Sequence, residues 1–380
     1  MFDFSRENKS LLASWWRNID KTILSLILLL FFLGLFFSFS STSPVIGEKL
    51  NKESYFFFLK HLVFVVIALI IILFISLQKR KTIKAYLPYF FIISLLLLFL
   101  VPLIGSEVKG AKRWLDIPFL LRFQPIEILK PFFILMLAQI ISSQIIHNLY
   151  RKYFYTLVLL SVVLFLLIIQ PDLGQSVLLF SSWLVMIFSS GINLIILVIL
   201  FLICVLIFVS ILFFFPNKFG YILVRIKSFI DPTKGENYQS EKALEAIKSG
   251  GFTGRGLGEG ILKDRLPEAH TDYMFAIIAE EFGAILLLLL IIIFLFFSYR
   301  VLHKLLEEKD EYTKLVLVGL ISLLLIQTFI HIGVNIRLLP TTGITLPFLS
   351  YGGSSIVGNA IIAGLILNLT KKFQLNQDSL

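Results

Sequence analysis

Long apolar runs recur along the whole chain of 380 residues, and they restrict its fold more than any other feature. Each run is long enough to cross a hydrocarbon core of about 30 Å as a helix. The composition agrees, because 58% hydrophobic residues, 15% charged residues and a mean hydropathy of +0.92 exclude a water-soluble domain. The sequence therefore predicts an all-α polytopic membrane protein that forms one domain over residues 1–380. About ten spans are expected, at residues 22–41, 57–77, 86–104, 125–146, 153–169, 173–190, 193–215, 271–298, 314–333 and 354–370.

Basic residues concentrate in the two tails and in three short connections, at residues 79–84, 151–152 and 300–314. The positive-inside rule places such segments in the cytoplasm. An even number of spans puts both termini on that same side. We therefore expect a multi-pass protein of the cell inner membrane with both termini cytoplasmic.

One long loop, residues 216–270, joins the seventh and eighth spans and is expected outside the cytoplasm. Its nine Lys and Arg residues do not oppose this topology, since long loops translocate regardless of charge. The basic residues are either a solvated surface near lipid headgroups or a surface that attracts an anionic substrate. Within the loop, residues 240–248 have the pattern of an amphipathic helix. Residues 110–123 suit an interfacial segment anchored by Trp114.

Charged residues within or beside apolar spans are the first candidates for a site, because each is costly to bury in a membrane. Glu127 and Lys130 are three residues apart at the start of the fourth span and can pair on one helix face. A structural ion pair and a site role explain them equally well. Asp172 follows Pro171 between two spans, where we favour a helix N-cap over a site role.

A dense polar cluster, LPEAHTDY at residues 266–273, opens the eighth span on the outer side. Glu280 and Glu281 follow roughly 12 to 13 Å deeper and on other faces of the helix, so Asp272 is the carboxylate at the outer interface. Its alternative role is to support the helix N-terminus, for which Thr271 is an equally good cap. His270 has no partner at metal-ligand spacing, so no metal site is predicted.

Two irregular segments accompany this cluster. The Gly-rich run at 250–260 lacks the strand and spacing of a nucleotide-binding loop, and nucleic acid is not an expected partner. Its amides, with Arg255, Lys263 and Arg265 nearby, either cradle a pyrophosphate or merely keep the loop flexible. Prolines and glycines at 340–353 forbid a continuous helix, so this backbone must pack against protein or line a wet cavity.

These blocks together resemble the SEDS family of bacterial FtsW and RodA proteins, and they span nearly the whole chain in family order. Two departures are Ile126, where the family usually has serine, and His331, where an asparagine is expected. The residues at 130–131, 258–260 and 344–348 resemble those of alphaproteobacterial FtsW, in the cell-division branch, more than those of RodA, in the elongation branch. The matching blocks are KGAKRW (109–114), QPIEILK (124–130), QPDLG (170–174), YQ (238–239), GGFTGRGLG (250–258), LPEAHTD (266–272), EEFG (280–283) and LPTTGITLPFLSYGGSS (339–355).

The resemblance implies a peptidoglycan glycosyltransferase that polymerises lipid II at the outer face of the cytoplasmic membrane. It also implies partnership with a class B penicillin-binding protein and other division proteins. The family's catalytic aspartate falls on Asp272. The residues expected to contact substrate or line its cavity are Glu127, Lys130, Asp172, Arg113, Arg255, Lys263, Arg265 and His270.

An α-linked donor that gives a β-linked glycan implies inversion in one step at the anomeric carbon. Such a step needs one base, expected to be Asp272, and cations that hold the leaving pyrophosphate. No cofactor is identified, although a divalent cation could assist. Two other functions fit the same sequence: a lipid II flippase, which would also show a polar cavity in the membrane, and a non-catalytic scaffold.

Overall fold

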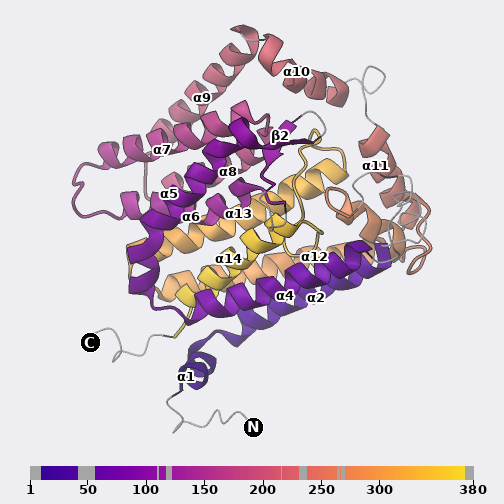
Figure 1. Ribbon diagram of the computed structural model, residues 1–380, viewed down its shortest axis with the longest axis horizontal. Helices are drawn as coiled ribbons and strands as arrows, with labels where there is room; N and C mark the ends of the chain where they lie inside the picture. The colour runs from indigo at the N-terminus through magenta and orange to yellow at the C-terminus, as the bar shows by residue number, and fades with distance from the viewer. Residues whose placement is uncertain are drawn as a thin grey trace.

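The computed structural model describes residues 10–41, 56–108, 111–116, 122–214, 216–230, 238–262, 266 and 270–372. In these ranges each of the ten predicted spans corresponds to a helix, which confirms the all-α polytopic prediction (Figure 1). Six of these helices are long and apolar enough by themselves to cross a membrane. The spanning helices are α2 (Lys21–Ser41), α4 (Phe56–Leu77), α5 (Arg80–Ile104), α6 (Pro125–Ile141), α7 (Leu149–Ile169), α8 (Leu173–Ser189), α9 (Leu194–Phe214), α12 (Met274–Glu307), α13 (Glu311–Asn335) and α14 (Gly353–Leu369).

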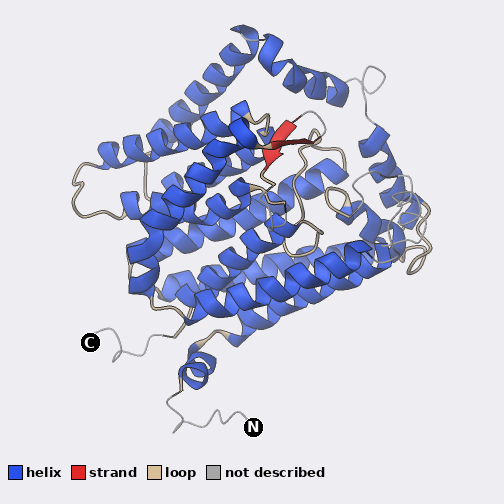
Figure 2. Cartoon of the chain, in the orientation of Figure 1, coloured by secondary structure: helices blue, strands red, loops and turns tan. Residues whose placement is uncertain are grey.

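Three further helices and one hairpin complete the described structure: α1 (Leu11–Asn18), α10 (Pro216–Ile230), α11 (Tyr238–Gly250), and strands β1 (Ser106–Val108) and β2 (Ala111–Trp114). Helix α11 confirms the amphipathic helix predicted at 240–248. Helix α10, within the connection 216–270, was not predicted. The antiparallel hairpin, red in Figure 2, was also missed: it includes the start of the segment expected to be interfacial.

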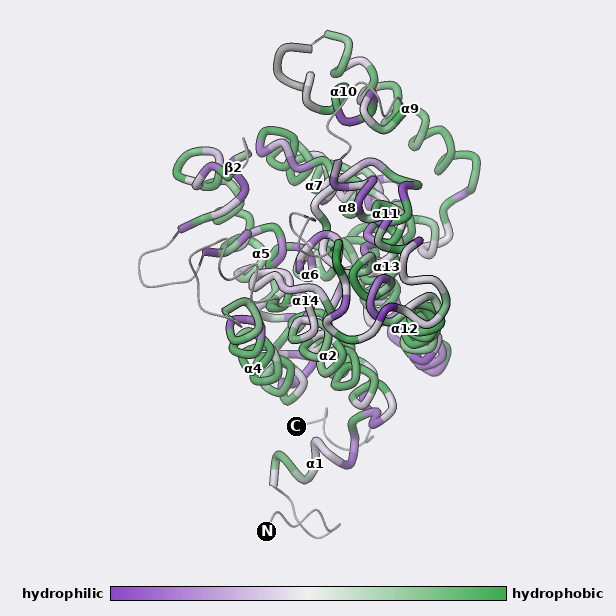
Figure 3. The backbone as a smooth tube through the Cα atoms, turned by 90° about the vertical axis from the view of Figure 1, so that its right-hand side faces the viewer, coloured by the Kyte–Doolittle hydropathy of each residue, from purple (hydrophilic) through white to green (hydrophobic). Residues whose placement is uncertain are grey.

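Helices α13 and α14 form the centre of the bundle. In α13, 72% of the apolar stretch is buried within the protein, against 22% in α4, so α4 faces lipid and α13 faces protein. Helix α14 packs along α4 and α6, while α13 packs against α6, α8 and α12. Hydrophobic residues run along α2, α4 and α12 in Figure 3. Because the two central helices are joined by the irregular segment 336–352, that segment is also held at the centre.

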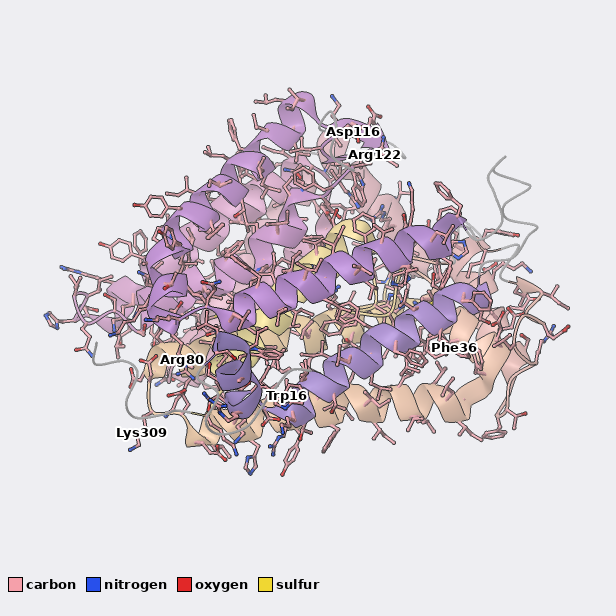
Figure 4. All side chains as sticks on the ribbon, turned by 60° about the horizontal axis from the view of Figure 1, so that its bottom comes forward. Trp16, Phe36, Arg80, Asp116, Arg122 and Lys309 are labelled. Carbon is pink, nitrogen blue, oxygen red and sulfur yellow. The ribbon has the colours of Figure 1, made fainter. Side chains whose placement is uncertain are left out.

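The two described chain ends lie at one end of the bundle. Lys372 N donates to Asn18 O at 2.9 Å, which ties the end of α14 to the end of α1. Arg80 at the start of α5 pairs with Glu308, beyond α12, at 2.9 Å. Figure 4 shows Arg80 and Lys309 at this end, with Asp116 and Arg122 away from it. The described chain ends and two basic connections therefore share one side, as predicted, and the cytoplasmic identity of that side stays a prediction.

The Gly-rich loop after α11 docks into a break in α12. At Gly283, φ is +78° and ψ is 179°, so the backbone leaves the helical conformation and α12 is kinked. Ala284 N donates to Gly251 O at 2.9 Å, and Arg255 N donates to Glu280 O at 2.9 Å. The loop thus supplies hydrogen-bond partners for backbone groups of α12 at the break. These bonds fix the position of the loop, which precedes residues 266–273 in the chain.

Substitutions in this loop should separate close packing from backbone strain. Gly254 and Gly258 have nearly equal φ values, +80° and +81°, so alanine is strained at both by about 1–2 kcal/mol. A Cβ at Gly254 would overlap the Glu281 carbonyl, whereas a Cβ at Gly258 would meet nothing within 4 Å. We expect Gly254→Ala to lower the melting temperature of the purified protein clearly more than Gly258→Ala does. Equal shifts would show that the loop does not pack on α12 as described.

Candidate active site

A cavity of about 400 Å³ lies where the β-hairpin, the starts of α6 and α12, and the segment after α13 meet. It brings together three of the predicted site residues, Arg113, Glu127 and Asp272. The other residues that line it are Val108, Ala111, Trp114, Arg122, Gln124, Arg225, Gln239, Thr271, Tyr273, Val334, Thr341, Thr342, Gly343, Ile344, Thr345, Gly352 and Ser355. The cavity is therefore built from segments that are far apart in the sequence.

Asp272 and Arg113 both line the cavity and both approach Gly343. A Cβ at Gly343 would lie 3.6 Å from Asp272 Oδ2 and 4.0 Å from Arg113 Nη1. Gly343 also has φ of +74°, a conformation that L side chains rarely adopt. Glycine permits this backbone conformation, and its lack of a side chain leaves the space beside the Asp272 carboxylate and the Arg113 guanidinium open. A ligand bound here could present a hydroxyl to the carboxylate and an anionic group to the guanidinium.

Asp272 is not the N-cap of α12. The helix begins at Met274, its N-cap residue is Tyr273, and the Tyr273 side chain makes no capping hydrogen bond. Neither Asp272 nor Thr271 occupies the capping position that the sequence allowed for them. The helix-capping alternative for Asp272 is therefore not supported, and its carboxylate lines the cavity instead.

Arg113, on β2, is held by the turn between α7 and α8. Its guanidinium donates to Gln170 O at 3.4 Å and to Pro171 O, and Nη1 lies 3.8 Å from Asp172 Oδ1. Asp172 also caps α8, since Oδ1 accepts from Gln175 N, as the sequence favoured. Burial raises the pKa of the Asp172 carboxyl, and the neighbouring Arg113 opposes this rise. Asp172 thus does not line the cavity itself but holds Arg113, which does.

Glu127, which lines the cavity, forms the predicted ion pair with Lys130. Lys130 Nζ lies 2.8 Å from Glu127 Oε2, and the Lys130 side chain is only 1% exposed. Gln175 donates to Glu127 Oε1 at 2.7 Å. Lys130 donates to Gln327 Oε1 at 3.3 Å, and Gln327 in turn donates to Thr345 O at 3.0 Å. The buried pair is therefore connected through α13 to the cavity wall, although Lys130 is not itself a lining residue.

Two predicted substrate contacts lie elsewhere. His270 is buried against the ring of Phe57, with centroids 5.0 Å apart, and its carbonyl accepts from Tyr351 N at 3.0 Å. Arg255 is exposed, and its amide is used in docking the Gly-rich loop on α12. Neither residue lines the cavity, and the substrate contact predicted for each stays a prediction. Lys263 and Arg265 lie outside the described residues.

Arg225 and Arg122 are the cations that the sequence did not single out. Arg225 projects from α10, and its Nη1 donates to Thr341 O at 3.4 Å. Arg122 pairs with Asp116 at 2.6 Å, and both side chains, labelled in Figure 4, are about half exposed. The only available signal for Arg225 was the amphipathic pattern of 216–230. With Arg113, these residues place three guanidinium groups around the cavity, which suits a ligand with a strongly anionic group.

No group of three or more His, Cys, Asp or Glu side chains gathers at metal-ligand spacing within the part of the chain that the structure describes. The divalent cation that could assist the reaction therefore stays a prediction.

The fold and the site define an integral membrane protein with a polar cavity at one end of its helix bundle. The FtsW/RodA/SpoVE family model, described as a cell cycle protein, matches residues 20–375. The chain belongs to this family.

Similar proteins support this assignment. The chain is 31% identical to the probable peptidoglycan glycosyltransferase FtsW of Caulobacter vibrioides over 97% of this chain and 93% of that one. It is 33% identical to the stage V sporulation protein E of Bacillus subtilis, with 93% and 97% covered. The structure of the rod shape determining protein RodA of Thermus thermophilus is 25% identical and matches with a TM-score of 0.67 over 93% of this chain and 96% of that one.

A second solved structure has a closer overall fold. It matches with a TM-score of 0.74 at 23% identity, covering 93% of this chain and 97% of that one. Its study concerns the coordination of polymerization and crosslinking by a peptidoglycan synthase complex. At this level of identity the match establishes the shared fold.

Proposed function

We propose that this chain is a peptidoglycan glycosyltransferase that polymerises lipid II into glycan strands, for septal wall synthesis in cell division. The observation that carries the proposal is the placement of both Asp272 and Arg113 beside Gly343, in a cavity that Arg225 also lines. FtsW relatives named as glycosyltransferases support the division branch over an elongation role.

The proposed reaction is a single displacement with inversion. The 4-hydroxyl of an acceptor sugar attacks the anomeric carbon of a donor linked to undecaprenyl pyrophosphate. Asp272 takes the hydroxyl proton as general base, the new glycosidic bond forms, and the bond to the pyrophosphate oxygen breaks. Arg113 and Arg225 stabilise the charge on the departing pyrophosphate. The Asp172 carboxylate keeps Arg113 in place.

The proposed location is the outer face of the cell inner membrane, with both termini in the cytoplasm. The cavity then opens outside, where a lipid-linked sugar can reach it from the bilayer. The proposed partners are a class B penicillin-binding protein, which would crosslink the new strands, and other membrane proteins of the division machinery. Support for a crosslinking partner comes from the synthase complex that shares this fold.

Incubation of the purified protein with lipid II, with and without its transpeptidase, tests the proposal. We expect glycan strands that a muramidase digests back to disaccharide units. A flippase would instead move lipid II between the leaflets of a liposome without forming polymer. Transport without polymer, under conditions in which a known polymerase is active, would reject the proposed function in favour of the transporter.

A further inference from the structure

Asn335, the last residue of α13, makes three hydrogen bonds from a fully buried side chain. Its Nδ2 donates to the backbone carbonyl of Asp272 at 3.0 Å and to that of His331 at 2.8 Å. Its Oδ1 accepts from the backbone N–H of Ala276 at 3.1 Å. The side chain therefore holds both Asp272 and the first turn of α12.

The bond to Ala276 replaces an ordinary helix cap. Ala276 is the third residue of α12, the position whose N–H usually donates to the side chain of the N-cap residue. The Tyr273 side chain at the N-cap provides no such bond, and Ala276 N also donates to the Tyr273 carbonyl at an N···O distance of 3.0 Å. Asn335 supplies a side-chain acceptor from the neighbouring helix, so the start of α12 is fixed to the end of α13.

The same face of α13 also holds the opposite wall of the cavity. His331, one turn before Asn335, has Nδ1 at 2.8 Å from Ile344 O; because a carbonyl only accepts, Nδ1 carries the proton. Gln327, one turn earlier again, donates to Thr345 O. Gln327, His331 and Asn335 lie four residues apart along α13. Together they attach both Asp272 and the segment after Gly343 to this one helix.

We propose that Asn335 is a positioning residue for glycosyl transfer, one that sets the distance between the Asp272 carboxylate and the opposite wall of the cavity. This inference rests on the proposed function. Without the Asn335 amide, the peptide at Asp272 loses its attachment to α13 and the carboxylate can shift. A displacement of about 1 Å in a reacting group can reduce a rate by about 10²-fold.

A matched control distinguishes positioning from general stability. Asn368 of α14 is buried to 1% exposure, and its Nδ2 donates to the carbonyls of Ile75, Ser76 and Gln78 at 3.0, 3.3 and 2.7 Å. It is therefore also a buried asparagine that holds backbone. It lies at the opposite end of the bundle from the cavity, beside the described chain ends.

The test compares purified Asn335→Ala and Asn368→Ala in lipid II polymerisation, together with their melting temperatures. We expect Asn335→Ala to lower kcat by about 10- to 100-fold with little change in KM. We expect Asn368→Ala to keep kcat within about threefold of the unaltered protein, even where it lowers the melting temperature as much.

A second substitution, Asn335→Asp, retains an oxygen for Ala276 N but replaces the amide that donates to Asp272 O. If Asn335 only capped α12, this variant would keep its activity; positioning predicts that it loses kcat. The same variant serves if Asn335→Ala does not fold. Wild-type kcat in a folded Asn335 variant would overturn the inference, provided that Asp272→Asn is inactive. Full activity of Asp272→Asn would instead reject the role of Asp272 as general base, and no polymer from the unaltered protein would reject the proposed function.

Discussion

Asp272→Asn is expected to reduce glycan-strand formation to near background while the protein stays folded. Asparagine keeps the size and much of the hydrogen-bonding capacity of aspartate, but it cannot accept the proton of the attacking hydroxyl. A positioned general base contributes about 10²- to 10⁴-fold to a rate. Because the Asp272 side chain lines the cavity and does not occupy the N-cap of α12, we expect the protein to fold with asparagine at this position. The measurement is the initial rate of lipid II polymerisation by purified variants at matched concentration.

Asp116→Asn provides the control for this substitution. Asp116 lies near the cavity, pairs with Arg122, and is half exposed. An exposed ion pair contributes little to stability, so this variant should polymerise lipid II at nearly the wild-type rate. If Asp272→Asn performs as well as Asp116→Asn, the proposed role of Asp272 as general base is wrong.

Lys130→Ala is expected to cause the largest loss of stability among these variants. The substitution leaves Glu127 as a buried carboxylate without its cation, which typically costs about 3–5 kcal/mol. We expect a lower melting temperature, less protein in the membrane and little polymerisation. Lys309→Ala, which changes an exposed lysine beyond α12, should affect none of these quantities.

A double substitution shows whether the pair also serves the reaction. Glu127→Gln with Lys130→Met removes both charges and leaves no uncompensated ion, so most of the stability should return. We expect polymerisation to stay low, because Glu127 lines the cavity and Lys130 connects to its wall through Gln327. A double variant that recovers both stability and full activity would mean that the pair is only structural.

The spanning helices were predictable because a run of apolar residues can be recognised without knowing what packs against it. The residues at which the helices end were harder to predict. The fourth span was predicted to end at residue 146, but α6 ends at Ile141, just before the polar residues 142–144. The eighth was drawn to residue 298, but α12 continues to Glu307, where Lys304 pairs with Glu307 at 2.7 Å along the helix.

The site was only partly predictable because its geometry depends on contacts between distant segments. Glu127 and Lys130 could be paired from their spacing, and Asp172 could be given a capping role from its place after Pro171. The contact of Arg225 with Thr341, by contrast, joins α10 to a segment 116 residues away. Asn335 could not be predicted as a site residue, because asparagine is common at helix ends and its three hydrogen-bond partners are known only from the structure.

The most direct test of the proposed active site is to locate bound lipid II. Lipid II with a photoreactive group on its sugar can be crosslinked to the protein, and the modified peptides identified by mass spectrometry. We expect modification at residues 270–273 and 341–345, suppressed by excess unmodified lipid II and retained in Asp272→Asn, which should still bind substrate. Competable modification only at the end of the bundle that contains Arg80 and Lys372 would contradict an outer-face transfer site at Asp272.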